Sequence, residues 1–360
     1  MLPYWLLFIL FAGGVIQSRR SRATLTQSGQ LVLSMPPSPL LIACAILPIA
    51  MIGFRYQVGA DWVPYELIYS TIGYLSFSQA LNYTDPGYGF INWLAHAMGA
   101  EIWLVNLTCG VIFTVGLVRF ANAQPNPWLA VVVAIPYLVI GVAMGYSRQA
   151  VAIGLAMIGL TALAKGSAIR FVLWVLAAAL FHRTAIIVLA IVGVAYSRNK
   201  LQALLLSAVA AAAAYFLLVR QVVEQYTVGY VENVYEAQGA GIRLAMNVVP
   251  AIVFLLYRRR FSLNSTELAV WTNFSVVALA FVVGYFAVAS SVIIDRLALY
   301  VIPLQLFVLS RVPYAFGQRG SANGTLLIVI VLYCAVVQFV WLNFANHAQY
   351  WLPYQFYPLF

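Results

Sequence analysis

The chain has 360 residues, of which 64% are hydrophobic and only 8% are charged, whereas about a quarter of the residues in a soluble domain are charged. A formal net charge of +10 would suggest nucleic-acid binding in a soluble protein, but basic residues also mark the cytoplasmic loops of membrane proteins. The composition therefore excludes a soluble globular domain, speaks against nucleic acid as a partner, and favours a protein whose main partner is the lipid bilayer.

Twelve apolar runs predict transmembrane helices, because about 20 residues cross the hydrocarbon core of a bilayer. In chain order they are 2–16, 39–54, 101–118, 128–145, 149–164, 170–181, 184–196, 201–219, 244–257, 268–289, 297–310 and 325–345. We expect an all-α integral membrane protein with about 12 such helices (11–14), forming one polytopic transmembrane domain over 1–360. The first run lacks the basic start and small-residue cleavage site of a signal peptide, and is expected to stay as a span.

One shorter segment, 86–99, contains Asn92 and His96. It could be a span, a re-entrant piece or an interfacial helix, and a crossing here would reverse the topology of all that follows. Three cysteines, Cys44, Cys109 and Cys334, fall inside apolar runs without metal-ligand or disulfide spacing, and are interpreted as small buried hydrophobic residues.

The loops between the runs alternate in charge if 86–99 does not cross. One set carries thirteen basic residues and a single acid, and the other carries six basic and eight acidic residues. The positive-inside rule assigns the first set to the cytoplasm and the second to the outside, together with both termini. The external side then holds the longer segments, namely a 55–100 loop with short helices, a 220–243 loop and a 346–360 tail.

Polar and ionisable residues gather on this external side in five short motifs. The first two lie in the 55–100 loop: 54–65 (FRYQVGADWVPY) and 84–93 (TDPGYGFINW). In the first, Arg55 and Asp61 follow a span, and Trp62 and Tyr65 offer flat faces of the kind that stack on sugars. Its plainer interpretation is an interfacial loop with an Arg–Asp pair. In the second, Asp85 either serves the function or only caps the helix after it.

The other three motifs place arginines at the ends of spans, where a charge is costly and by default marks a ligand pathway. Arg148 begins an apolar helix in 144–150 (MGYSRQA), and snorkelling to a lipid phosphate is the alternative. His182 and Arg183 interrupt an apolar hairpin in 180–184 (LFHRT). In 294–300 (IDRLALY), Asp295 and Arg296 open a span, either as a functional pair or as a local ion pair. Arg243, after a Gly-Ala-Gly stretch, is a weaker candidate of the same sort.

Several arginines, one or two carboxylates and a histidine on one face suit a particular chemistry. The guanidinium fork binds phosphate oxygens in pairs and keeps its charge, so converging arginines suggest an anionic lipid-linked ligand such as a pyrophosphate. A histidine or aspartate can act as general base on a hydroxyl. Because the acids lack the spacing of a recognisable metal site, we predict a reaction without metal or other cofactor, on a substrate with a good leaving group.

These motifs resemble the EpsG-type family of polytopic proteins, related to Wzy-type O-antigen and exopolysaccharide polymerases. The matching residues are Arg55, Val58, Gly59, Asp61 and Tyr65, the segments 85–90, 147–150 and 181–184, and Asp295, Arg296 and Tyr300. The resemblance implies a GT-C-like membrane glycosyltransferase in the bacterial inner membrane with a periplasmic active face. It would join undecaprenyl-pyrophosphate-linked repeat units, one as glycan donor and one as acceptor. A chain-length regulator is a further expected partner.

The resemblance also suggests roles for individual residues. Asp61 or His182 would be the catalytic base, and Arg148, Arg183 and Arg296 would bind the pyrophosphate, helped by Arg55 and Arg243. Trp62, Tyr65 and Tyr88, with Asp85 and Asp295, would contact sugars. A ligase that moves finished glycan to another acceptor would use a similar donor site. A polyprenyl-phosphate-sugar transferase, a lipid-linked-sugar transporter and a non-catalytic assembly subunit are the other readings. A transporter predicts polar residues through the mid-membrane, rather than at one face.

Overall fold

The computed structural model describes residues 1–17, 24–25, 31–32, 38–196, 239–287, 291–318 and 321–359. Apart from one antiparallel pair of two-residue strands, β1 (Thr24–Leu25) and β2 (Leu31–Val32), the regular structure in these ranges is helical. The chain divides into two units: residues 1–182 with 309–360, and residues 183–308.

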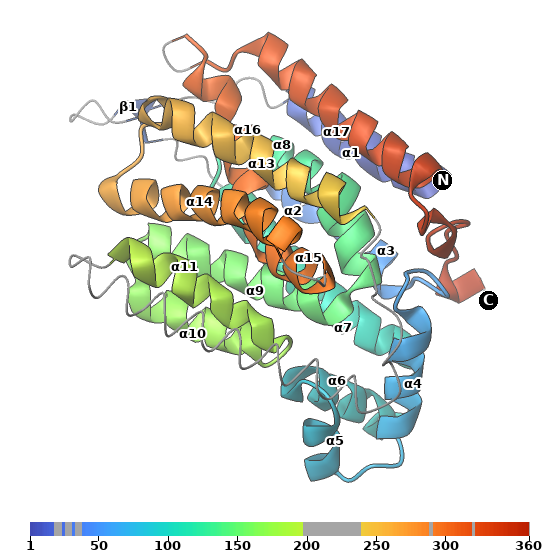
Figure 1. Ribbon diagram of the computed structural model, residues 1–360. Coiled ribbons are helices and arrows are strands. Elements are labelled where there is room, and N and C mark those ends of the chain that lie inside the picture. Colours follow the sequence, from blue (N-terminus) through green and yellow to red (C-terminus); the bar gives the residue numbers. More distant parts are fainter. Residues whose placement is uncertain are drawn as a thin grey trace. The chain divides into compact units, whose positions relative to one another are not determined.

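The first unit holds most of the helices (Figure 1). They are α1 (Leu2–Gln17), α2 (Pro39–Cys44), α3 (Ile46–Gly53), α4 (Trp62–Ile72), α5 (Phe77–Tyr83), α6 (Pro86–Ala97), α7 (Ile102–Asn122), α8 (Pro127–Ala134), the π-helix η2 (Ile135–Ala143), α9 (Ser147–Ala164), α10 (Ala168–Ala179) and α17 (Gly324–Phe344). Helix α16 (Pro303–Ala315) begins in the second unit and ends in the first.

Helix α9 is the centre of the first unit, packed between α7 and α10. Most of its 18 residues are buried, which fits a helix that is apolar on every side. The approach to α7 is close enough that a Cβ built on Gly116 would lie 2.2 Å from the Gly154 carbonyl oxygen. Small residues at such a contact let two backbones approach, which is the usual way for helices to associate in lipid.

The segment 55–100 folds as three short helices, α4, α5 and α6, grouped together in Figure 1. Helix α6 packs on α4, α5 and α7. It has twelve residues, a length of roughly 18 Å, which is too short for a hydrocarbon core of about 30 Å. Helix α10, an expected span, has the same twelve residues, so the three interpretations of 86–99 all stay predictions. Pro86 and Asp85 define the start of α6.

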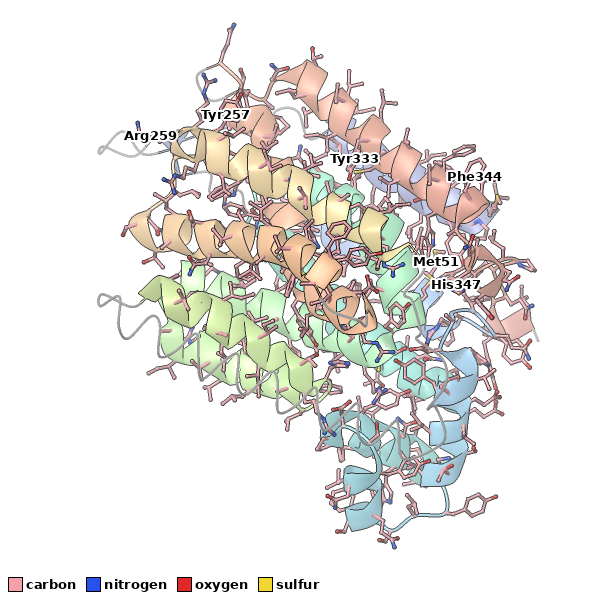
Figure 2. All side chains as sticks on the ribbon, viewed as in Figure 1. Met51, Tyr257, Arg259, Tyr333, Phe344 and His347 are labelled. Atoms are coloured by element: carbon pink, nitrogen blue, oxygen red, sulfur yellow. The ribbon has the colours of Figure 1, made fainter. Side chains whose placement is uncertain are left out.

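One end of the first unit gathers segments that are far apart in the sequence. The Tyr4 hydroxyl donates to the Trp351 carbonyl (2.8 Å) and the Tyr354 hydroxyl to the Met51 carbonyl (3.0 Å). Figure 2 shows Met51, Phe344 and His347 at this same end. The start of α1, the end of α3 and the segment after α17 therefore share one end, together with the Arg55 and Ser147 side chains described below.

The second unit contains η3 (Arg183–Ile186), α11 (Ile187–Tyr196), α13 (Ala240–Tyr257), η4 (Arg258–Phe261), α14 (Ser265–Ala287), α15 (Ser291–Ala298) and η5 (Leu299–Val301). Helix α14 packs on α11 and α13. A buried polar network crosses this apolar packing, in which Gln305 donates to Asn247 Oδ1 (2.7 Å) and Asn247 donates to the Ala298 carbonyl (3.2 Å). Each of these groups is buried with a partner, as a polar group in an apolar interior must be.

Six helices in the described ranges are long and apolar enough to cross a membrane: Ile102–Asn122, Ser147–Ala164, Ala240–Phe261, Ser265–Ala287, Ile294–Ala315 and Gly324–Phe344. Five of the expected spans are instead apolar helices of 10–17 residues, within Leu2–Ile16, Pro39–Gly53, Pro127–Ala143, Ala168–Ala179 and Arg183–Ala195. The expected span 201–219 lies outside the described residues, as does most of the expected 220–243 loop. Apart from the β1–β2 pair, the described part of the chain is that of a helical membrane protein. The count of twelve spans and the GT-C-like architecture stay predictions.

Candidate functional site

An ion pair joins the start of α9 to the start of α6. Arg148 is the second residue of α9, and its Nη1 donates to Asp85 Oδ2 (3.0 Å) and to Thr84 Oγ1 (3.0 Å). The Asp85 side chain is 7% exposed and that of Arg148 27%. Asp85 occupies the N-cap position of α6 without making a side-chain capping bond. Its carboxylate therefore compensates Arg148, whose charge lies at the unfavourable, positive end of the α9 dipole.

Arg55 lies in the segment after α3 and is completely buried. Its Nη2 donates to Ser147 Oγ (2.8 Å) and Asn106 Oδ1 (3.0 Å), and its Nε donates to the Val58 carbonyl (3.2 Å). In the described part of the chain, no carboxylate lies within ion-pair distance of this guanidinium. A buried charge that has only neutral partners is costly, by several kcal/mol after relaxation.

A glycine allows the Arg55 segment to reach the turn before α9. Gly59 has φ of +109°, and a Cβ built on it would lie 2.2 Å from the Met144 carbonyl oxygen. A side chain at this position would meet both backbone strain and a clash. The close approach brings Arg55 to Ser147, and thus to the residue preceding Arg148.

Three aromatic side chains surround the two guanidinium groups. The Cζ of Arg55 lies 5.7 Å from the Trp62 ring centroid, and the Cζ of Arg148 lies 5.8 and 5.9 Å from those of Tyr65 and Tyr88. These are cation–π distances. We call Arg55, Trp62, Tyr65, Asp85, Tyr88 and Arg148 the arginine cluster. All six were sequence-predicted site residues. The three rings are buried against the arginines, and contact between these rings and a sugar stays a prediction.

Five buried polar atoms in and next to the arginine cluster have no hydrogen-bond partner among the described residues: Arg55 Nη1, Trp62 Nε1, Tyr88 OH, Asn106 Nδ2 and Arg148 Nε. Each can donate a hydrogen bond, and leaving a buried donor unpaired costs about 1–3 kcal/mol. Native proteins contain few such groups, and each calls for an explanation. Five donors around two positive charges are suited to a ligand with several anionic oxygens.

The tyrosine hydroxyls of the cluster stay protonated. Burial raises the pKa of Tyr88 well above its ordinary value, outweighing the opposing effect of the two arginines. Burial also raises the pKa of Tyr65, against the lowering influence of Arg148. Burial lowers the pKa of Arg55, but guanidinium groups remain charged in proteins. At neutral pH the cluster therefore offers two cations and two neutral hydroxyls.

Of the two candidate bases, Asp61 adjoins the cluster along the chain, whereas His182 comes from the end of another helix, α10. Asp61 is the N-cap residue of α4, next to Trp62, and its charge is among those that raise the pKa of Tyr65. His182 is buried just after α10. The end of α10 reaches the start of α6, because the Leu180 carbonyl accepts a hydrogen bond from the Gly87 N–H (2.8 Å). Which of the two acts as the base stays open, as it was from the sequence.

The remaining candidates belong to the second unit. Arg243 in α13 and Asp295 in α15 form a two-point ion pair, with Nε to Oδ1 at 2.7 Å and Nη2 to Oδ2 at 2.8 Å. The sequence suggested an ion pair between Asp295 and the adjacent Arg296 as the plainer interpretation of this motif. In the structure Asp295 does form an ion pair, but with Arg243. Arg183 begins η3 and Arg296 lies in α15, both partly exposed, and a pyrophosphate-binding role for Arg183, Arg243 and Arg296 stays a prediction.

Three polar partners of the arginines escaped the sequence analysis as site residues: Thr84, Asn106 and Ser147. Thr84 and Ser147 adjoin Asp85 and Arg148 in two of the five motifs, where the charged neighbours give the stronger signal. Asn106 has no such neighbour. Its one signal is that it is an amide one turn inside a largely apolar helix, α7, a place where a polar side chain needs a buried partner.

Among the described residues, no three His, Cys, Asp or Glu side chains lie close enough together to hold a metal ion. Cys109 and Cys334 are buried and Cys44 is partly buried, and none forms a disulfide in this part of the chain. Among the described residues, ionisable groups lie together as two arginines with Asp85 in the first unit and as Arg243 with Asp295 in the second.

Comparison with known proteins gives one assignment. No curated protein and no solved structure matches the chain. The model of the EpsG family matches residues 40–356, most of the chain and all six members of the arginine cluster. The chain therefore belongs to the EpsG family, a family of polysaccharide polymerase-like membrane proteins.

Proposed function

We propose that this protein is a membrane glycosyltransferase that polymerises undecaprenyl-pyrophosphate-linked oligosaccharide repeat units, as Wzy-type polymerases do. Its active face would be the periplasmic side of the bacterial inner membrane, the side to which the charge pattern assigns the segment 55–100. The observation that carries the proposal is the arginine cluster, which presents two guanidinium groups and several unpaired donors in a member of a polysaccharide polymerase-like family.

The reaction needs a site that stabilises negative charge on a leaving group. The acceptor hydroxyl oxygen attacks the anomeric carbon of the donor sugar, and the bond from that carbon to the pyrophosphate oxygen breaks. The hydroxyl proton passes to Asp61 or His182, and undecaprenyl pyrophosphate leaves. Arg55 and Arg148 would hold the pyrophosphate oxygens and stabilise the charge that develops on them, as preorganised donors do in other transferases. The cations are supplied by the protein, so the proposed reaction uses no metal.

A ligase would need a similar donor site and is the second candidate. The two differ in what accumulates when the gene is deleted in its own host. Loss of a polymerase leaves single repeat units on the final acceptor, and loss of a ligase leaves long chains that remain on the lipid carrier. A transporter is less well supported, because the clustered polar groups of the first unit lie at helix starts beside α4 and α6 rather than along the middle of several spans.

Tyr88→Phe is expected to lower polymerisation activity roughly 10- to 100-fold, the loss expected for one hydrogen bond to a charged oxygen. The variant should fold as well as the wild type, because the lost hydroxyl is buried without a partner in the described structure. Activity in membranes and the melting temperature in detergent measure the two effects. Tyr69→Phe is a matched control that loses a hydroxyl bonded to the Ala100 carbonyl, away from the arginines. A Tyr88→Phe variant with full activity would remove this hydroxyl from the site.

A further inference from the structure

The segment after α17, residues 345–359, crosses the end of the first unit that carries the arginine cluster. From its composition, with Tyr350, Trp351, Tyr354 and Tyr357, it would be taken for an aromatic belt at the membrane surface. The structure shows a different use of Trp351, which is only 1% exposed and packs inside the protein. We call residues 345–359 the strap.

Trp351 anchors the strap to the turn before α9. Its Nε1 donates to the Ile140 carbonyl (2.7 Å), and its own carbonyl accepts from the Tyr4 hydroxyl (2.8 Å). The π-helix η2, to which Ile140 belongs, ends four residues before Ser147. A Cβ built on Gly145 would lie 2.8 Å from the Trp351 ring, so the glycine is what lets the indole lie against this turn.

The strap also pairs with the segment that carries Arg55. The Tyr56 N–H donates to the Gln355 carbonyl (3.0 Å), the Tyr357 N–H to the Phe54 carbonyl (2.7 Å), and the Gly59 N–H to the Tyr350 carbonyl (2.7 Å). Arg55 and Phe356 form an antiparallel bridge. Backbone hydrogen bonds to the strap therefore hold the chain on both sides of Arg55, although the strap lies about 300 residues away in the sequence.

The two sets of contacts fix the two arginine-bearing segments relative to each other. One anchor holds residues 140–147, which lead into Arg148, and the other holds residues 54–59. From these observations we infer that the strap positions Arg55 and Arg148, with Trp351 as the positioning residue that joins both anchors. The strap touches neither guanidinium group through a hydrogen bond of its own, so it acts through the backbone. The catalytic consequence rests on the proposed function, whereas the positioning itself does not.

Trp351→Phe tests this inference, because it removes the Nε1 donor and keeps an aromatic ring. Trp341→Phe is the matched control. It makes the same change in a ring whose centroid lies 5.4 Å from that of Trp351. The Nε1 that it removes is buried without a partner in the described structure. Two measurements are made on both variants in liposomes: amide hydrogen exchange over residues 54–59 and 140–147, and the kcat and KM for lipid-linked repeat units.

Trp351→Phe should raise amide exchange in both segments and lower kcat about tenfold or more, as small misplacements of catalytic groups do, while Trp341→Phe changes either by less than about twofold. Equal exchange and equal kcat in the two variants would overturn the inference. Raised exchange with unchanged kcat would overturn the catalytic consequence, because the strap would then hold structure that the reaction does not use. If the wild type makes no polymer but Trp351→Phe still raises exchange in both segments, the proposed function fails and the positioning stands.

Discussion

Arg148→Lys should lower polymer formation at least about 100-fold while the protein remains folded in the membrane. Losing one preorganised donor at a site of developing negative charge typically costs two to three orders of magnitude, and a lysine cannot reproduce the planar fork. The lysine ammonium can still compensate the buried Asp85 carboxylate, which lies 3.0 Å from the arginine. This is why lysine is a sharper test than alanine, which would leave Asp85 unpaired and risk unfolding.

The assay is the length distribution of lipid-linked glycans in membranes, with the amount of folded variant measured in parallel. Arg170→Lys is the matched control, since Arg170 is an exposed residue near the start of α10. Polymer of normal length and amount from Arg148→Lys would show that the bidentate fork is not used. The ion pair with Asp85 would then be structural.

Arg55→Met should separate activity from stability. We expect polymer formation to fall about 100-fold or more, because the variant removes a positive charge from the proposed pyrophosphate site. We expect the melting temperature to change little, because Arg55 is fully buried without a carboxylate partner in the described structure. A buried charge costs several kcal/mol, and removing it offsets the loss of the hydrogen bonds to Asn106, Ser147 and the Val58 carbonyl.

Arg243→Met provides the contrast. This arginine has a carboxylate partner, and its loss leaves Asp295 uncompensated with an 11% exposed side chain, a change that costs about 3–5 kcal/mol when a buried pair is broken. Thermal unfolding in detergent compares the two variants. If Arg55→Met unfolds as readily as Arg243→Met, Arg55 is a structural residue whose hydrogen bonds to Asn106 and Ser147 hold the fold, and its assignment to the site is wrong.

The sequence predicts the helical elements well because hydrophobicity alone decides them. The expected runs 101–118 and 325–345 correspond to α7 (Ile102–Asn122) and α17 (Gly324–Phe344). Residues 86–99 are ambiguous because their apolar content suits both a short helix and a span, and the twelve residues of α6, as many as in the expected span α10, do not decide between the two. The run 39–54 is divided into α2 and α3 at Ala45, and the missed signal is Pro48, which cannot donate to the carbonyl of residue 44 and whose ring crowds that carbonyl.

The residues of the candidate site could be predicted from the sequence, but the contacts between them could not. Lone arginines at span ends are conspicuous in an apolar sequence, so Arg55, Arg148 and Arg243 were all identified. Their partners depend on tertiary contacts across 63 residues for Arg148 with Asp85, and 52 residues for Arg243 with Asp295. The sequence therefore suggested the adjacent pairs Arg55–Asp61 and Asp295–Arg296. The role of the strap was hidden for the same reason, since an aromatic-rich segment has the same composition whether it lies in an interface or is buried.

The most direct test uses the purified protein alone, reconstituted in liposomes with undecaprenyl-pyrophosphate-linked repeat units from its own host and with EDTA present. Glycans are released and separated on a gel, and free undecaprenyl pyrophosphate is quantified. The proposed function predicts a ladder of increasing length, with one undecaprenyl pyrophosphate released for each linkage formed, and no ladder with Arg148→Lys. Repeat units that stay single, with no lipid released, would contradict the proposal that this protein is a polymerase.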